Sequence, residues 1–474
     1  MSTRAWDVTV VGAGLAGCEA AYQLAERGLT VRLVEMKPAR RTPAQATDRL
    51  AELVCSNSLR SNNPNNAVGL LKEEAFRLGS LVLRAAYEAR VPAGDALAVD
   101  RTQFATFIES ALHGHPRIRM ESRVVTTLPD AVDGPCIIAT GPLTADELAH
   151  DLVRVTGHER LYFYDALAPI VAGDSIDTTV AFSASRWGKG EGSDYLNCPL
   201  DKPQYLAFVE ALLTAEHMPH HAFEEPKYFS GCQPIEVIAA SGVDALRYGP
   251  MKPVGLDDPR TGRWPYAVVQ LRREDKAGQA WNLVGFQTKL KWPEQQRIFR
   301  TLPGLERAEF LRLGVMHRNT YLDSPALLDE RMRLTTRPHL SFAGQITGVE
   351  GYVESAAHGL LTALLLASDL RLTPLEPPPA TTALGALYRH VRGLDRLPGR
   401  PHEPQNVNWG MTPPLDERVR KRDAKAARLA RARHAFEQWA ATQQLALHAA
   451  PAPSVLAEPA STDSAQSTTQ VGTP

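Results

Sequence analysis

Several features that would narrow the function are missing from this chain of 474 residues. It contains no run of about 18 apolar residues, so the sequence predicts no membrane-spanning helix. Its 52 Lys and Arg are balanced by 53 Asp and Glu, which gives a formal net charge of -1. The chain therefore lacks the excess of positive charge that many nucleic-acid-binding proteins have. A polyanion that binds here must therefore use a local basic patch.

Cysteine is scarce, and its spacing excludes two common uses. The five cysteines are widely separated and none belongs to a C-x-x-C pair, which argues against a structural zinc site and against a local redox dithiol. We expect free thiols in a reducing cytoplasm. The N-terminus passes within a few residues into an apolar strand, so we also expect no signal peptide and a cytoplasmic protein. The five positions are Cys18, Cys55, Cys136, Cys198 and Cys232.

The clearest motif that is present opens the chain. Residues 7–11 read as a buried strand, residues 12–17 (GAGLAG) as a glycine turn and residues 18–28 as a helix, before a second strand over 29–34 that ends at Glu35. This order is typical of a dinucleotide-binding unit, in which the glycines and the helix N-terminus hold a pyrophosphate and the carboxylate binds an adenosine ribose. The candidate cofactor contacts are Gly12, Ala13, Gly14, Leu15, Ala16, Gly17 and Glu35.

NAD and FAD share this fingerprint, and two later segments favour FAD. Residues 137–141 (IIATG) form a short apolar strand that ends at Gly141, and residues 340–363 read as a strand, a glycine-rich loop and a helix. A loop of that kind before a helix N-terminus is a place for a second phosphate or for the edge of an isoalloxazine. No second G-x-G-x-x-G follows, so we expect no separate NAD(P)H domain. Candidate contacts in the loop are Gly344, Gln345, Gly348 and Gly351.

The length of the chain exceeds one ordinary core and predicts two or three structural units. We expect an α/β protein whose Rossmann-like FAD-binding domain is discontinuous. Its two parts would be residues 1–143 and 338–446, interrupted by an inserted α/β substrate domain over 144–337. Such an insertion typically brings substrate over a cofactor held by the parent domain. The tail over 447–474 is rich in Pro, Ala, Ser and Thr, which predicts disorder.

A local basic patch is found near the C-terminus. Residues 418–434 hold eight Lys and Arg against one acidic residue, and their alanine-rich spacing predicts a helix. Such a helix would bind phosphates with salt-dependent affinity, whereas a solvated helix face explains the same pattern equally well. The candidate phosphate contacts are Arg418, Arg420, Lys421, Arg422 and Arg428.

One known family matches the chain in many segments between about residue 5 and residue 435. The segments GAGLAGCEAA, VCSNSLRSN, YLNCP, GCQPIEV, RYGPMKPVGL, VGFQTKLKWPEQQRIFR, GVMHRNTYL and GQITGVEGYVESAAHG together resemble the folate- and FAD-dependent tRNA (uracil-5-)-methyltransferases. Small departures stand at Gln45, Asp95 and Ser230. The resemblance implies methylation of uridine 54 in the T-loop of bacterial tRNA, with methylenetetrahydrofolate as carbon donor. It also implies FADH2 as reductant, regenerated by NADH or NADPH, and no obligatory protein partner.

The resemblance assigns roles to two of the five thiols. Carbon 5 of uracil is a poor nucleophile, but a thiolate that adds to carbon 6 creates an enolate whose carbon 5 attacks an electrophilic one-carbon unit. Cys232 is the candidate for that thiolate. Cys55 is the candidate for the partner that removes the carbon-5 proton or protects the flavin site, and the two roles can be exchanged. Composition alone would make Cys55 an unreactive loop thiol.

Two functions of other classes stay open at this stage. One is an enzyme of the related flavin family that modifies wobble uridine with a GTPase partner, against which the paired motifs VCSNS and GCQPIEV argue. The other is a flavoprotein that binds tRNA without methylating it, since motifs show which groups are present and not how they are aligned. Residues 56–66 (SNSLRSNNPNN) are polar and include Arg60. They bind the edge of a uracil or pterin, or they merely form a turn before the next helix. For Asp100, Arg101 and residues 317–319, a place near flavin or folate and a role at the surface are equally compatible with the sequence.

Overall fold

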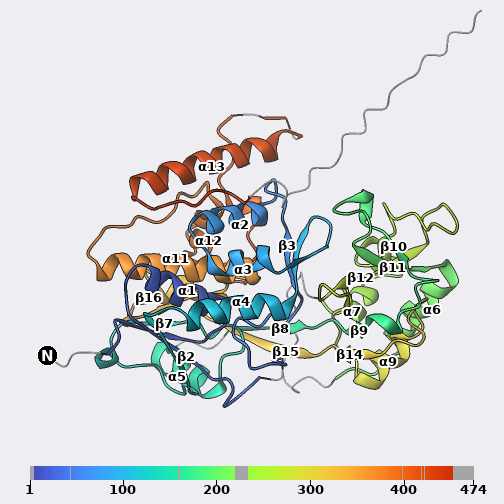
Figure 1. The fold of residues 1–474 in the computed structure, drawn as a ribbon, viewed down its shortest axis with the longest axis horizontal. Helices are drawn as coiled ribbons and strands as arrows, with labels where there is room; N and C mark the ends of the chain where they lie inside the picture. The colour runs from blue at the N-terminus through green and yellow to red at the C-terminus, as the bar shows by residue number, and fades with distance from the viewer. Residues whose placement is uncertain are drawn as a thin grey trace, which may run out of the picture.

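The computed structural model describes residues 5–42, 44–157, 161–218, 233–397, 399–417, 419–420 and 422–451, with the backbone alone at 161–165 and 316–318. These residues form a larger and a smaller lobe (Figure 1). The larger hydrophobic core draws on residues before 153 and after 321, and the smaller core on residues 171–308. The predicted α/β fold is confirmed, whereas the domain boundaries after residues 143, 337 and 446 stay predictions.

The larger lobe is organised around a six-stranded sheet. Its strand order is β16-β17-β7-β1-β2-β6, and the contacts among the last five strands are parallel. Strand β17 comes from the far end of the chain and pairs with β7, so the sheet is built from both parts of the sequence. The bounds are β1 Val8–Val11, β2 Val31–Glu35, β6 Ile118–Ser122, β7 Cys136–Ile138, β16 Arg333–Leu334 and β17 Arg337–Phe342.

Helices and a small sheet complete the larger lobe. The small antiparallel sheet has the order β3-β5-β4, and its strands are β3 Ser58–Ser61, β4 Arg90–Val91 and β5 Ala96–Val99. The helices are α1 Leu15–Glu26, α2 Ala67–Arg77, α3 Leu81–Glu88, α4 Arg101–His113, α5 Asp146–Thr156, α10 Ser324–Leu327, α11 Tyr352–Leu370, α12 Ala383–Arg392 and α13 Ala424–Thr442. None of the described helices is long and apolar enough to cross a membrane.

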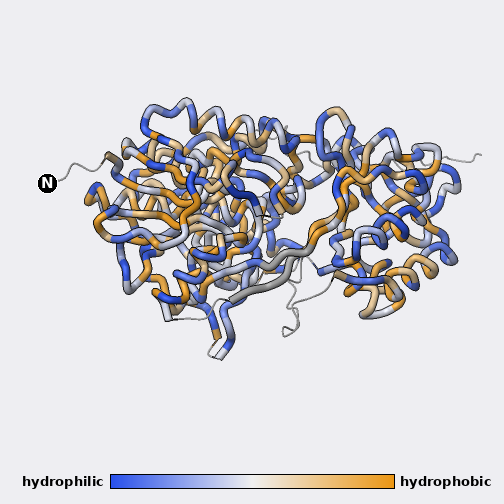
Figure 2. Tube along the Cα trace, turned by 90° about the horizontal axis from the view of Figure 1, so that it is seen from below, coloured by the Kyte–Doolittle hydropathy of each residue, from blue (hydrophilic) through white to orange (hydrophobic). Residues whose placement is uncertain are grey.

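The smaller lobe is built on an antiparallel sheet of order β10-β11-β12-β13-β9-β14. Its strands are β9 Ile170–Ala172, β10 Phe182–Ser183, β11 Tyr195–Leu200, β12 Ala267–Arg273, β13 Ala280–Leu283 and β14 Phe310–Arg312, and its helices are α6 Lys202–Leu213, α7 Ile235–Ala240, α8 Ala245–Tyr248 and α9 Trp292–Phe299. Two antiparallel strands, β8 Leu161–Ala166 and β15 Met316–Tyr321, join the lobes, which stay distinct when seen from below (Figure 2).

Helix α11 packs against α1, the first helix of the chain, and holds it in place. A side chain at Gly359 would place its Cβ 2.3 Å from the carbonyl oxygen of Ala16, so only glycine lets the two helices approach this closely. Ala16 belongs to the first turn of α1, directly after the glycine turn. The late segment of the chain therefore buttresses the predicted dinucleotide motif.

The basic C-terminal helix differs from the prediction. Helix α13 begins at Ala424 rather than at residue 418, and it extends to Thr442. A run of basic residues in a first helical turn would face the positive end of the helix dipole, which disfavours helix at those positions. Asp423 stands at the N-cap instead.

Candidate active site

A cavity that is open to solvent lies where strands β1, β2 and β7 end. Ligands of open α/β sheets bind at these carboxyl ends. Several residues of the sequence motifs line the cavity, namely Gly12, Gly14, Leu15, Ala16, Glu35, Gly141 and Gln345. Sequence reasoning missed further lining residues: Arg123 and Thr144 lie outside the quoted segments, and Thr140 and Tyr352 lie inside them without having been singled out.

The glycine turn has no room for a side chain at Gly12 or Gly17 and opens onto the cavity at Gly14. A Cβ at Gly12 would lie 2.6 Å from the carbonyl oxygen of Ala139, and a Cβ at Gly17 would lie 1.8 Å from that of Gly12. Nothing lies within 4 Å of the corresponding position at Gly14, which lines the cavity and caps α1 without a side-chain hydrogen bond. The first-turn N–H groups of α1 thus form a cradle for an anion, and this cradle fits a dinucleotide pyrophosphate.

Glu35 supports the turn from the end of β2. One carboxylate oxygen accepts the N–H of Ala13 at 2.7 Å, and the other accepts the N–H of Lys37 at 3.1 Å. Each oxygen retains a further lone pair for a ribose hydroxyl. Ala13 and Gly17 do not line the cavity, so their contribution is to the shape of the turn.

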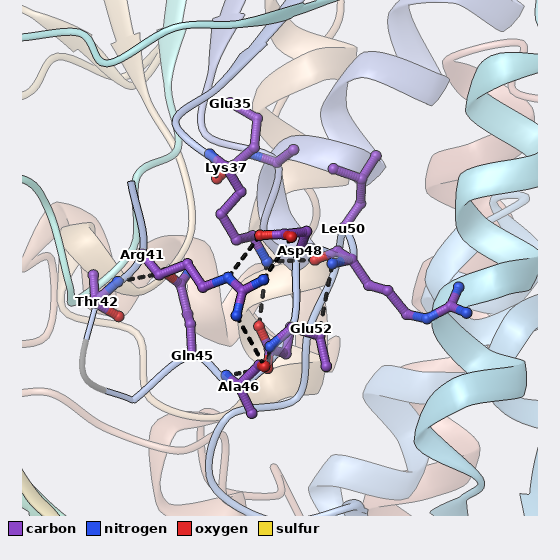
Figure 3. A network of polar contacts seen from close by, with 12 residues as sticks. Glu35, Lys37, Arg41, Thr42, Gln45, Ala46, Asp48, Leu50 and Glu52 are labelled. Atoms are coloured by element: carbon purple, nitrogen blue, oxygen red, sulfur yellow. Dashed lines mark hydrogen bonds and ion pairs between the residues drawn. The ribbon is translucent and has the colours of Figure 1, made fainter. Parts of the chain in front are cut away.

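The segment between β2 and Cys55 forms one wall of the cavity, and a network of polar contacts holds this segment in shape (Figure 3). The Lys37 ammonium donates to the carbonyl of Arg49 and pairs with Glu52 at 3.2 Å. The other oxygen of Glu52 accepts the N–H of Ala46 at 2.7 Å. Gln45, one of the departures from the family pattern, and Glu52 both line the cavity. The network therefore holds the wall that leads to the thiol.

The second glycine-rich loop contributes one lining residue. Gln345 faces the cavity, whereas Gly344, Gly348 and Gly351 allow close packing behind it. A Cβ at Gly348 would lie 2.2 Å from the ring of His402, and one at Gly351 would lie 2.5 Å from the carboxylate of Glu354.

Two histidines, the buried His402 and the half-buried His390, hold this loop from behind. His390 contacts the carbonyl oxygen of Gly348 at 2.9 Å, and His402 contacts that of Thr347 at 3.0 Å, with the two ring centroids 4.9 Å apart. Burial lowers the pKa of His390 to about 4 and also lowers the pKa of His402. Both rings are therefore neutral at pH 7 in the folded protein.

We expect acid to destabilise the protein through His390. Between its folded pKa of about 4 and its unfolded pKa of about 6.5, the unfolded state binds more protons, so stability falls as the pH is lowered. From pH 7 to pH 5 the loss attributable to His390 is about 2 kcal/mol. Urea unfolding at both pH values measures it. His390→Gln should remove this part of the pH dependence, and His113→Gln at an exposed site should not.

Cys55 is accessible, unlike the other thiols that the structure describes. It lies in the loop before β3 and is partly exposed, whereas Cys18, Cys136 and Cys198 are buried and not disulfide-bonded. Burial raises the pKa of Cys136 and Cys198 to about 12 and also raises that of Cys18, so these three stay protonated. Cys232 and Ser230 lie outside the described residues.

Tyr352 joins the cavity to the Cys55 segment. Tyr352 lines the cavity, and its hydroxyl oxygen accepts the N–H of Cys55 at 2.7 Å and that of Ser56 at 3.1 Å. Burial raises the pKa of the Tyr352 hydroxyl, which stays neutral. The thiol-bearing backbone is thereby anchored beside the cavity.

Two arginines bind carbonyl oxygens of the same backbone. Arg101, the first residue of α4, donates to the carbonyls of residues 53 and 55, and Arg312, from β14 of the smaller lobe, donates to those of residues 54 and 55, the latter at 3.0 Å. Arg101 is also paired with the buried carboxylate of Glu274, again from the smaller lobe. The Cys55 segment is thus clamped between the lobes.

Neighbouring polar residues are also engaged within the protein. Asn57 is fully buried and donates to the carbonyl oxygens of Val99 and Arg273, one in each lobe. Arg60 is paired with Glu354, whose side chain is fully buried. Asp100 caps α4. The side chains of residues 317 and 318 are not described.

The structure describes three of the five predicted phosphate contacts, and these three differ in what they touch. Arg428 donates to the carbonyl oxygen of Trp409 at 3.1 Å, so it helps to attach α13 to the larger lobe. Arg420 and Arg422 are exposed and precede the helix, and Arg422 lies 3.5 Å from Asp423. Arg418 and Lys421 lie outside the described residues.

Comparison with known proteins identifies the family. The family model described as Glucose inhibited division protein A matches residues 7–373. A methylenetetrahydrofolate–tRNA-(uracil-5-)-methyltransferase TrmFO of Anaeromyxobacter dehalogenans (strain 2CP-C) is 59% identical over 434 residues, which is 91% of this chain and 96% of the relative. The chain belongs to the TrmFO family. A TrmFO of Myxococcus xanthus (strain DK1622) is 56% identical over 93% of this chain and 96% of its own length. The resemblance predicted from the sequence is confirmed.

A solved structure supports the TrmFO fold. GidA of Aquifex aeolicus, in its form I crystal, superposes with a TM-score of 0.64 and covers 93% of this chain and 78% of its own. The two are 14% identical, so the likeness concerns the fold.

Proposed function

We propose that this TrmFO protein methylates carbon 5 of a uridine in tRNA, at position 54 of the T-loop, and takes the carbon from methylenetetrahydrofolate. FAD is the proposed cofactor, and NADH or NADPH its reductant. Relatives that carry this activity in their names support the proposal at 59% and 56% identity. The observation that carries it is that Tyr352 lines the cavity beside the glycine turn and also binds the backbone of the accessible Cys55.

Particular residues would hold the cofactor. The turn at Gly14 and the N-terminus of α1 would bind the pyrophosphate, Glu35 the ribose, and Gly141 and Gln345 other parts of the same molecule. FAD supplies hydride chemistry when it is bound. The Cys55 segment stands at the edge of this site because Tyr352 belongs to both.

The thiols would act on the uracil itself. One thiolate adds to carbon 6, which places negative charge on the ring and makes carbon 5 nucleophilic. Carbon 5 would then bond to the one-carbon unit of methylenetetrahydrofolate, and the other thiol would take the carbon-5 proton as the folate nitrogen leaves that carbon. The resulting methylene group becomes a methyl group when it gains a hydride, the chemistry that reduced FAD would supply, and departure of the first sulfur restores the double bond between carbons 5 and 6. Cys55 and Cys232 are the proposed pair, with Cys232 as nucleophile. We propose that Arg420 and Arg422 bind tRNA phosphates, that the protein works in the cytoplasm, and that no protein partner is required.

Methyl transfer to an unmodified tRNA transcript tests this function. The protein is incubated with labelled methylenetetrahydrofolate and NADPH, or with labelled S-adenosylmethionine, and the label is located by nuclease mapping. We expect folate-dependent label at T-loop carbon 5 and none from S-adenosylmethionine. A transcript with cytidine at that position is the matched control. Absence of label from either donor, with FAD bound and tRNA bound, would favour a flavoprotein that binds tRNA without methylating it.

A further inference from the structure

We propose that the smaller lobe carries an aromatic ledge, Trp187 and Trp264, on which unpaired nucleotides of the RNA substrate stack. This inference rests on the proposed function. The two side chains are 63% and 48% exposed, and their rings meet edge to face with centroids 6.1 Å apart and planes at 87°. Large parts of both rings are therefore open to solvent. Unpaired bases offer π-faces that stack on such rings without a sequence requirement.

The backbone of Trp187 is shaped to present the ring. Its φ of 60° and ψ of 28° lie in the left-handed region, which bulky residues rarely adopt. The Trp187 amide donates to the carbonyl oxygen of Gly255 at 3.0 Å, and a Cβ at Gly255 would lie 2.6 Å from the ring. The ring thus rests on glycine backbone and remains mostly exposed. Burial does not account for this conformation, and residues held in such regions cluster at functional sites.

Arg186 makes the ledge rigid before any ligand binds. Its guanidinium donates to the carbonyl oxygens of Lys252 and Val254 and to the side chain of Gln270. These bonds join the loop that carries Trp187 to the segment that supports the ring. A ring fixed in advance loses little conformational freedom on binding.

Two exposed cations and one exposed carboxylate, Asp257, lie beside the ledge in the sequence. Lys252 and Arg263 are exposed next to the supporting segment and to Trp264, and no ion pair with a described residue involves their side chains. The neighbouring Asp258 is already paired with Arg260 at 2.8 Å. Stacking surfaces flanked by uncommitted cations are typical of proteins that bind unpaired RNA through bases and phosphates together.

The ledge is fastened to the part of the larger lobe that bears the thiol. Lys189 pairs with Asp95, which is one of the three departures from the family pattern. Asp194 accepts the N–H of Gly94 at 2.6 Å. The loop at Gly94 leads into β5, which pairs with β3, and β3 begins three residues after Cys55. The loop that follows Trp187 is therefore bonded to the part of the larger lobe that includes Cys55, and we expect an RNA bound at Cys55 to extend over the ledge.

Binding of an unmodified tRNA transcript tests the ledge. Filter binding at fixed salt should show that Trp187→Ala with Trp264→Ala raises the Kd about ten- to a hundredfold. The double variant to Phe should stay within about threefold of wild type, because Phe still stacks. The slope of log Kd against log salt should not change, since the phosphate contacts remain. In methyl transfer, KM for tRNA should rise while kcat at saturating tRNA stays within about twofold.

Matched controls separate this proposal from a folding defect and from the proposed function. Leu213→Ala removes another half-exposed apolar side chain of the same lobe and should leave the Kd unchanged. If wild type binds tRNA and the Ala double variant binds it equally tightly, the ledge is overturned and the proposed function stands. If the Ala and Phe variants lose affinity equally, stacking is overturned as the cause. If wild type binds no tRNA, both proposals fail.

Discussion

Cys55→Ala is expected to lower folate-dependent methyl transfer by at least about a thousandfold, the size of loss found when a group that acts directly in the chemistry is removed. Alanine keeps the backbone N–H that Tyr352 accepts and the carbonyl that Arg101 and Arg312 bind. The segment should therefore hold its position, and only the sulfur is lost. FAD absorbance per protein should equal that of wild type, because the cavity wall is unchanged.

Single-turnover transfer to the tRNA transcript is the measurement, with Cys198→Ala as the control. Cys198 is buried in the smaller lobe, where burial keeps its thiol protonated, so its loss should leave transfer within about twofold. A Cys55→Ala protein that methylates at the wild-type rate would remove Cys55 from the chemistry. Equal loss in both variants would indicate instability instead, and the FAD content would show it.

Local features of the site were predictable from the sequence because their causes are local. The strand at Val8–Val11, the turn at Gly12 and the acidic end of β2 follow from apolar runs, glycine spacing and one carboxylate. The helix begins at Leu15 rather than at residue 18, since Gly14 itself serves as the N-cap. The sequence pattern therefore predicted helix α1 correctly, but it placed the first residue of the helix three positions too late.

The contacts that position Cys55 were not predictable in this way. Arg312 and Tyr352 stand 257 and 297 residues away along the chain, and both contact backbone atoms, which leave no mark in composition or periodicity. The same applies to Gly359, whose need for glycine arises from the approach of Ala16. Contacts of this kind depend on how the lobes and layers come together, which the sequence pattern of either segment does not contain.

Removal of the Arg101 side chain is expected to cost about 3–5 kcal/mol of stability, because it leaves a buried carboxylate without its partner. Glu274 is 4% exposed, and its second oxygen has no hydrogen-bond partner among the described residues. Urea unfolding of Arg101→Ala measures the loss. Lys291→Ala, which breaks an exposed ion pair with Glu216, should cost less than about 1 kcal/mol and is the matched control.

The double variant Arg101→Met with Glu274→Met separates two effects of Arg101: its ion pair with Glu274 and its hydrogen bonds to the Cys55 segment. Replacing both charges by apolar groups of similar length should restore most of the stability, since neither charge is then left buried alone. Methyl transfer should stay at least about tenfold below wild type, because the carbonyls of residues 53 and 55 still lack the Arg101 donors and the thiol is no longer held in one geometry. Recovery of both stability and transfer would mean that Arg312 and Tyr352 alone position Cys55.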